Sequence, residues 1–231
     1  MKWRLMKLLI LAAHPDDAEI AIGGTMLTHA LKGDEVYLLN FTNGEPTPNG
    51  TVEKRMAEAE ESGDILKIKK RIVMDLPNRY LQDTIENREK VAEHIREIRP
   101  DVLLVQYHVD QHPDHIAASQ LGTAARFYAK LTKTDMKGDP FYPPKILYYY
   151  TPHFKYIPQP SFVLPVSDEV FREKVKAVQA YRSQFVHKNR DIPEFLKVMG
   201  KQFGMRINRP YAEPFYTPEL LGIEGLKNVT W

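Results

Sequence analysis

The fold is decided by residues 8–25, which read LLILAAHPDDAEIAIGGT. An apolar run from Leu8 to Ala13 ends at His14, and apolar residues at helical spacing resume after Gly24. A short apolar run that ends in polar residues and restarts as a helix predicts a buried strand, a tight loop and a helix. Ligands collect at the carboxyl ends of strands in open parallel sheets. The loop therefore holds an imidazole and two carboxylates where a site is expected.

Three interpretations of this loop are open from its residues alone. Asp16 or Asp17 can cap the following helix, since Asp is a favoured N-cap residue. A phosphate-binding loop is disfavoured, because the pattern G-x-G-x-x-G is absent and two carboxylates would repel a pyrophosphate. The third interpretation is a metal site, in which His14 and an aspartate bind a cation such as zinc and the spare carboxylate acts as a base.

The composition narrows the class of protein. The 231 residues fit one α/β domain, which we assign to residues 1–231. A net charge of +2 without a long basic run argues against nucleic acid as a partner. The chain has no cysteine, so disulfides and thiolate metal sites are excluded. Any transition metal must then be bound by histidine and carboxylate ligands.

The N-terminal apolar run predicts a strand rather than an export signal. It is short and passes directly into HPDD at residues 14–17, with no polar region between. No apolar run approaches the roughly 20 residues that span a membrane. We therefore expect a soluble, cytoplasmic protein without a membrane partner.

Strand-like and helix-like segments alternate along much of the chain. The patterns predict strands at 8–13, 35–41, 71–76, 101–107, 146–151 and 161–166, and helices at 19–32, 51–66, 84–98, 116–130, 167–185 and 191–204. Residues 211–231 show few periodic signals. The alternation predicts a Rossmann-like α/β fold, with a mostly parallel, doubly wound sheet, helices on both faces and a C-terminal extension.

A second group of ligand-type residues follows the fourth predicted strand. Residues 112–115 read HPDH, and His108 and Asp110 stand just before them. In the common doubly wound strand order, strands one and four are neighbours at the topological switch point. The two loops would then face one crevice, although about 100 residues separate them in sequence. This coincidence favours a metal site over two unrelated capping loops.

The two polar motifs, AHPDD at 13–17 and HPDH at 112–115, resemble those of the PIG-L/LmbE-like zinc N-deacetylases. Further family-like segments are Asn43-Gly44-Glu45, Gly50-Thr51 and Arg55 of the second loop, and the late motifs YRSQF at 181–185 and YAEPF at 211–215. The late motifs resemble a bacterial subgroup that includes the N-acetylglucosaminyl-malate deacetylase of bacillithiol synthesis. The resemblance covers most of the chain and implies a zinc-dependent hydrolase of a linear amide.

The resemblance implies one Zn²⁺ per chain, held by His14, Asp17 and His115. Three protein ligands leave the fourth position of a catalytic zinc open for water, whose pKa the metal lowers to about 7. Asp16 is then the general base, because the lone pairs of Asp17 are committed to the metal. A carboxylate beside a cation should be ionised near neutral pH.

The resemblance also places His112 on the far side of the acetamide carbonyl. Protonated, His112 would stabilise the oxyanion, and Asp114 would orient it. Arg55 is expected to bind sugar hydroxyls or a carboxylate, with a solvated helix arginine as the alternative, and Arg79 is a weaker candidate of the same kind. Gln111 stands where some bacterial relatives have Arg, and Gln cannot pair with a carboxylate.

The implied substrate is a small molecule that contains N-acetylglucosamine (GlcNAc). GlcNAc-malate or a similar glycoside is expected, and Gln111 leaves a neutral glycoside or a chitooligosaccharide open. A hydrolase of another amide or of a phosphoester and a non-catalytic metal-binding module are the alternatives, although structural zinc sites are usually closed cages with Cys. Family likeness also implies a homo-oligomer, a trimer or hexamer.

Some polar and aromatic residues near the two loops have no assigned role. Glu19 either tunes the metal or favours the helix N-terminus. The others are His108, Asp110, Tyr148, Tyr149, Tyr150 and His153. We expect the first two to support their loop, the tyrosines to pack in the core, and the last histidine to be a candidate for the acyl pocket.

Overall fold

Seven strands form one sheet in the computed structural model, which describes residues 5–151, 158–185, 191–223, 225 and 229. The strands are β1 (Lys7–Ala12), β2 (Glu35–Asn40), β3 (Lys70–Val73), β4 (Val102–Gln106), β5 (Lys145–Tyr149), β6 (Phe162–Val166) and β7 (Tyr211–Tyr216). Their order across the sheet is β3-β2-β1-β4-β5-β7-β6. The first five strands in this order pair in parallel, whereas β7 is antiparallel to both β5 and β6.

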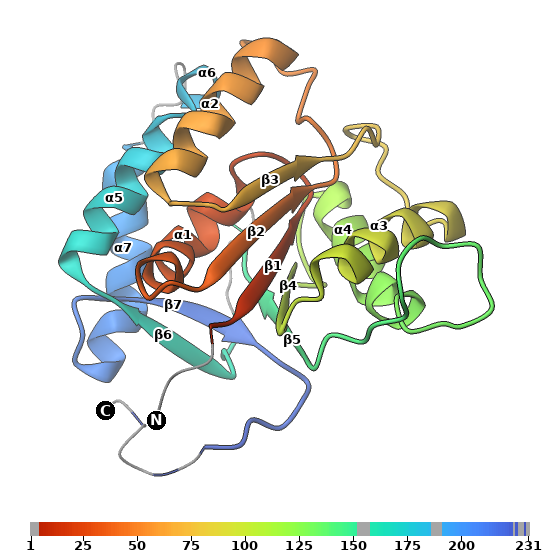
Figure 1. Cartoon of the computed structure of the whole chain (residues 1–231). Helices are drawn as coiled ribbons and strands as arrows, with labels where there is room; N and C mark the ends of the chain where they lie inside the picture. Colours follow the sequence, from red (N-terminus) through yellow and green to blue (C-terminus); the bar gives the residue numbers. More distant parts are fainter. Residues whose placement is uncertain (1–4, 152–157, 186–190, 224, 226–228, 230–231) are drawn as a thin grey trace.

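Helices cover both faces of this sheet (Figure 1). They are α1 (Asp17–Leu31), α2 (Val52–Ile65), α3 (Ile85–Ile98), α4 (Pro113–Tyr128), α5 (Asp168–Gln179), α6 (Arg182–Phe185) and α7 (Ile192–Gly204), with a 3₁₀ turn at Met205–Ile207. α3 and α4 lie on one face, and α1, α2, α5 and α7 lie on the other. In the part of the chain that the structure describes, none of these helices has the length and apolar character of a membrane span.

Two apolar layers result, because successive side chains of a strand point to opposite faces. In β1, Leu9 and Leu11 pack toward α3 and α4, whereas Leu8 and Ile10 pack toward α1 and α5. All four side chains are buried. A strand covered on both faces reads as a continuous apolar run, and this is the reason that residues 8–13 could be recognised as a central strand.

The predicted sheet is confirmed at the position that matters for the site. β1 and β4 are neighbours and pair in parallel, in a register that runs from Leu8 opposite Val102 to Ile10 opposite Leu104. Their carboxyl ends therefore lie at the same edge of the sheet. The loops that follow them, with HPDD and HPDH, come together as the strand order predicted.

Two helix starts differ from the prediction. α1 begins at Asp17 and not at Glu19, and α4 begins at Pro113 and not at Ile116. Pro is favoured in the first turn of a helix, since its missing N–H would have no partner there. Residues 113–115 therefore belong to a helix rather than to the predicted loop.

The C-terminal part differs more. In the stretch 211–231, where the sequence shows few periodic signals, residues 211–216 form β7 between β5 and β6. The single helix predicted for 167–185 is two helices, α5 and α6, with Ala180 and Tyr181 between them. The acyl-pocket candidate His153 lies outside the described residues.

Candidate metal centre

The loop after β1 is a tight turn that sends two neighbouring carboxylates to different partners. The His14 backbone N–H donates to Asp17 Oδ2 at 3.0 Å, which fixes the turn at the start of α1. Asp16 has φ 102° and ψ −28°, a conformation uncommon for a residue other than glycine. As a result, Asp17 faces the site histidines, whereas Asp16 faces Arg55 on α2.

The loop after β4 enters α4 through residues that suit a helix start. His112 is the N-cap residue, and its Nδ1 accepts a hydrogen bond from the Asp114 backbone N–H at 3.2 Å. His115 is in the first turn of the helix and is fully buried. The helix start therefore places Asp114 and His115 against the loop after β1.

Asp17 lies between two imidazoles, one from each loop. Its Oδ2 is 3.3 Å from His14 Nδ1, and its Oδ1 is 3.3 Å from His115 Nε2. All three side chains are buried, and their ligand atoms lie within 4.8 Å of one another. Nitrogen and oxygen ligands at ~2.0–2.1 Å from a tetrahedral zinc are about 3.3 Å apart. These three residues therefore fit a zinc ion.

Each of the two histidines contacts a second carboxylate through its other ring nitrogen. His14 Nε2 lies 3.0 Å from Asp114 Oδ2, and His115 Nδ1 lies 3.0 Å from Asp110 Oδ2. Thr151 donates its hydroxyl to the same Asp110 oxygen. Carboxylates behind ligating histidines fix the ring orientation and raise ligand basicity. His14 Nδ1 and His115 Nε2 are thus the atoms that would hold a metal.

The carboxylates also raise the pKa values of both imidazoles in the metal-free chain. Burial lowers the pKa of His14, but hydrogen bonds to Asp114 and Asp17 outweigh it and raise the pKa to about 9. Burial is likewise outweighed at His115, where Asp17 and Asp110 raise the pKa to about 10. Burial works against ionisation of Asp17, yet His115 and His14 hold its pKa well below the usual range. The same negative charge favours a bound cation.

Two buried amides support this group from the strand ends. Gln106, the last residue of β4, accepts from the Ala13 backbone N–H at 2.8 Å and donates to Asp17 Oδ2 at 3.2 Å. Asn40, the last residue of β2, donates to the His14 backbone carbonyl at 3.0 Å. Both side chains are fully buried. Neither amide was predicted as part of the site, although an amide that ends an apolar strand beside a polar loop is a usable signal.

The predicted base Asp16 forms a pair with Arg55. Asp16 Oδ2 lies 3.2 Å from Arg55 Nη2, which also donates to the Pro15 carbonyl. Burial raises the pKa of Asp16 to about 6, with Arg55 opposing the shift. Arg55 is only 3% exposed, so it is not a solvated helix arginine. The alternative of a solvated arginine is therefore wrong, and the role of Arg55 in substrate binding stays a prediction.

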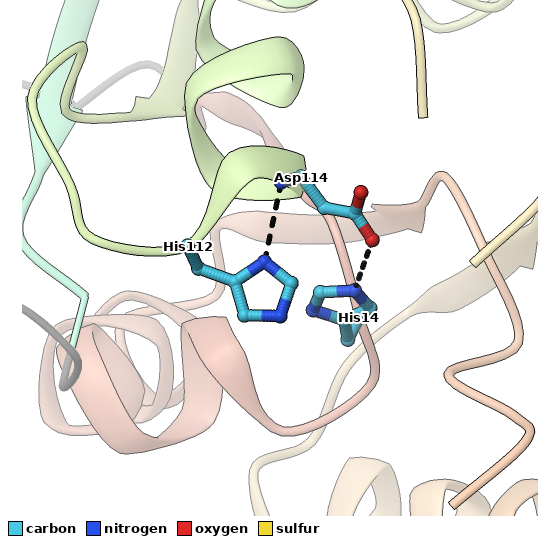
Figure 2. A group of neighbouring side chains, drawn as sticks. All are labelled: His14, His112 and Asp114. Atoms are coloured by element: carbon cyan, nitrogen blue, oxygen red, sulfur yellow. Dashed lines mark hydrogen bonds and ion pairs between the residues drawn. The ribbon is translucent and has the colours of Figure 1, made fainter. Parts of the chain in front are cut away.

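His112 lies beside the triad, but Asp114 does not orient it as expected. Figure 2 shows that the Asp114 carboxylate points to His14, and that Asp114 contacts the His112 ring through its backbone N–H. Burial and the neighbouring His115 and His14 lower the pKa of His112 to about 4. The ring is therefore neutral near pH 7, and not protonated as predicted. Since Nδ1 accepts a hydrogen bond, the proton of the neutral ring is on Nε2.

The other two predicted substrate residues lie on the surface. Arg79 follows β3, and its backbone N–H donates to Asp114 Oδ2 at 2.7 Å while its guanidinium donates to the Pro46 carbonyl at 2.8 Å. Gln111 precedes the N-cap residue of α4. Both residues are exposed, so their side chains are accessible to a ligand at this edge of the sheet.

Most of the residues without an assigned role are buried in internal contacts. Glu19 is fully buried and contacts Arg71, with 2.8 Å between Oε1 and Nη2, and the Tyr181 hydroxyl. It therefore belongs to an internal network rather than to the metal ligands. Tyr149 is fully buried and donates its hydroxyl to the Leu11 carbonyl, as expected for a core residue. The rings of Tyr148 and Tyr150 are also buried, whereas His108 is exposed.

The chain is similar to known proteins over most of its length. The family model PIG-L, described as GlcNAc-PI de-N-acetylase, matches residues 9–126, which include both loops. The diacetylchitobiose deacetylase of Thermococcus kodakarensis is 31% identical over 90% of this chain and 81% of its own length.

Solved structures are similar over nearly the whole chain. The conserved protein TT1542 from Thermus thermophilus is 35% identical, with a TM-score of 0.87 over 95% of this chain and 98% of that one. The N,N'-diacetylchitobiose deacetylase from Pyrococcus horikoshii is 26% identical, with a TM-score of 0.78 over 91% of this chain and 82% of that one. The family match and these likenesses, together with the two motif loops, show that the chain belongs to the PIG-L family of de-N-acetylases.

Proposed function

We propose that this protein is a zinc-dependent N-deacetylase that releases acetate from the GlcNAc unit of a small glycoside. The observation that carries the proposal is the position of Asp17 between His14 and His115, with the carboxylate of Asp16 on the adjacent residue. Membership of a de-N-acetylase family supports amide hydrolysis. Relatives named as diacetylchitobiose deacetylases support a GlcNAc-containing substrate.

Different residues would bind the metal and act as the general base. His14 Nδ1, His115 Nε2 and one oxygen of Asp17 would hold the metal. When bound, zinc supplies Lewis acidity, which makes water a nucleophile at neutral pH and polarises the acetamide carbonyl. Asp16 removes the proton of the attacking water. A pKa of about 6 leaves Asp16 ionised near pH 7 and makes it a stronger base than an ordinary aspartate.

His112 acts on the acetamide oxygen in this proposal. Its ring is half-buried and lies against both histidines of the triad, with ring centroids 4.9 Å from His14 and 4.6 Å from His115. The neutral ring carries a donor at Nε2, which can hydrogen-bond the oxygen as negative charge develops there. The carbon–nitrogen bond then breaks, and the proton that Asp16 accepted is available to the leaving amine.

A neutral glycoside is the preferred substrate class. Gln111 and Arg79 are the exposed polar residues that the sequence placed at this edge, and the Arg55 guanidinium is already occupied by Asp16. An anionic malate aglycone would then depend on Arg79 for a charge partner. Diacetylchitobiose, whose second sugar is neutral, needs no such partner. We therefore place diacetylchitobiose before GlcNAc-malate.

Amine release from a substrate panel tests this function. The panel is GlcNAc, diacetylchitobiose and GlcNAc-malate, each incubated with zinc-loaded protein and with protein treated with a chelator. We expect turnover that the chelator abolishes, with the highest kcat/KM on diacetylchitobiose. A higher kcat/KM on GlcNAc-malate would reverse the choice of aglycone. Folded, zinc-loaded protein without turnover on all three would contradict the function.

A further inference from the structure

The side chain of Gln106 joins the two loops that carry the candidate metal ligands. Gln106 is the last residue of β4 and is fully buried. Its Oε1 accepts from the Ala13 backbone N–H at 2.8 Å, and its Nε2 donates to Asp17 Oδ2 at 3.2 Å. Ala13 and Asp17 follow β1, whereas β4 leads into the loop and helix of His115. One amide therefore connects the loop after β1 to the strand that leads to the third ligand.

The two contacts require an amide in one orientation. The backbone N–H of Ala13 can only donate, so the amide oxygen faces it and the amide NH₂ faces Asp17. An apolar side chain at position 106 would make neither hydrogen bond. A glutamate would accept from Ala13 but would bring a second carboxylate against Asp17. The residue type at this position is therefore matched to both partners.

Gln106 acts on one of the two oxygens of the Asp17 carboxylate. Oδ2 accepts from Gln106 and also from the His14 backbone N–H at 3.0 Å. Oδ1 lies 3.3 Å from His115 Nε2. The two donors to Oδ2 come from different segments of the chain, so the carboxylate cannot turn without breaking at least one hydrogen bond. The orientation of Oδ1 toward His115 is therefore set by the protein itself.

The second buried amide near the site has a different relation to the ligands. Asn40 donates to the His14 backbone carbonyl at 3.0 Å, and its side-chain oxygen accepts from Arg71 at 2.8 Å. These contacts support the backbone of the loop after β1. The Gln106 amide, in contrast, donates to the side chain of a candidate ligand. This difference separates a residue that orients the carboxylate from one that only supports the loop.

We propose that Gln106 is a positioning residue for Asp17, and that it holds the carboxylate in the orientation that binds the metal. The proposal rests on the proposed function, in which Asp17 is a metal ligand. It implies that loss of the Gln106 amide weakens metal binding and changes the surroundings of the bound ion. A residue that only stabilises the loop would change neither property.

Zinc affinity provides the first test. Gln106→Met should weaken zinc binding about 10- to 100-fold, the usual effect of removing the hydrogen-bond partner of a ligand. Competition with a chromophoric chelator measures this affinity. Thr42→Val is the matched control, because Thr42 is fully buried and donates to the carbonyl of Ala13 at 3.0 Å. It should bind zinc within about twofold of wild type. Similar affinities of the two variants would overturn the proposal.

The visible spectrum of cobalt-substituted protein provides a readout that loss of stability does not produce. The position and intensity of the Co²⁺ bands depend on the number and arrangement of the ligands. Spectra are recorded at saturating Co²⁺, so that a difference in affinity does not enter. Gln106→Met should change the bands, whereas Thr42→Val should have the wild-type spectrum. A wild-type spectrum in Gln106→Met would show that Gln106 only supports the loop.

Gln106→Asn keeps the test decisive if Gln106→Met does not fold. It retains an amide, but the side chain is one methylene shorter and cannot reach both Ala13 and Asp17. Gln106→Asn should therefore bind zinc more weakly than Thr42→Val does and should have changed cobalt bands. Wild-type values of both properties would overturn the proposal. Wild-type protein that binds no zinc would instead contradict the proposed function, which is a different outcome from any of these.

Discussion

Asp110 Oδ2 lies 3.0 Å from His115 Nδ1, on the side of the ring opposite to Asp17. The pair leaves Nε2 of the imidazole facing Asp17 at 3.3 Å. Asp110 is therefore more than a support for its loop, because it decides which nitrogen of His115 faces the metal position. Asp114 has the same relation to His14.

The first prediction concerns this outer carboxylate. Asp110→Ala should weaken zinc binding about 10- to 100-fold, since a ligating histidine loses orientation and basicity without its partner. Competition with a chromophoric chelator measures the affinity. Asp139→Ala, in the exposed connection between α4 and β5, is the control and should bind zinc like wild type. Equal affinities of both variants would contradict the role of Asp110.

The second prediction separates base from ligand. Asp16→Asn should keep full zinc content, because the Asp16 side chain contacts Arg55 and not the two histidines. Its kcat should fall about 10²- to 10⁴-fold, the usual contribution of a general base. Metal analysis and steady-state kinetics on the same preparation check both statements. Loss of zinc in this variant would make Asp16 a ligand instead.

The third prediction concerns His112. His112→Ala should lower kcat about 10²- to 10³-fold, the effect of removing one donor to a developing oxyanion, with zinc still bound. His94, on α3, is more remote in the fold and pairs with Glu97 at 3.7 Å, so His94→Ala is a suitable control with unchanged kcat. Unchanged kinetics of His112→Ala would remove this residue from the reaction.

The metal site could be predicted because its residues follow two central strands. β1 and β4 are buried on both faces, so they appear in the sequence as apolar runs that end at HPDD and near HPDH. The rule for strand order then brings the two loops together. Side-chain partners over long distances carry no such pattern. The burial of Arg55 against Asp16 is an example, because an arginine on a predicted helix has the same appearance in sequence whether it is buried or solvated.

β7 could not be recognised from its own residues for a similar reason. Its sequence, YAEPFY, contains a proline and a buried glutamate, which interrupt the pattern of a strand. Glu213 is 4% exposed and accepts from the backbone N–H groups of Gly24 and Thr25 at 2.9 and 2.7 Å. Those donors are about 190 residues away in sequence, so only the folded chain provides them.

The fourth prediction tests this buried contact. Lys174 on α5 donates to Glu213 at 2.6 Å, and both side chains are at most 7% exposed. Lys174→Met should destabilise the protein by about 3–5 kcal/mol, because it leaves a buried carboxylate without its counter-ion. Lys176→Met removes an exposed pair with Glu173 on the same helix and should cost about 0–1 kcal/mol. Denaturant unfolding measures the free energy of unfolding of both variants. Similar losses of stability would mean that the buried pair stabilises the fold no more than the exposed pair does.

The fifth prediction concerns pH and metal removal. In the metal-free chain, folding raises the pKa of His14 to about 9 and that of His115 to about 10, from about 6.5 when unfolded. A raised histidine pKa stabilises the fold fully below pH 6.5, and this stabilisation is lost as pH rises toward 9–10. Asp16, with a pKa of about 6, is largely ionised in this window and adds little slope. The Tm of chelator-treated protein should therefore fall between pH 6.5 and 9.5.

Zinc binding requires the deprotonated histidines, so the increase in Tm on adding zinc should grow over the same pH range. A zinc-induced increase that is constant with pH would show that these two histidines are not the ligands.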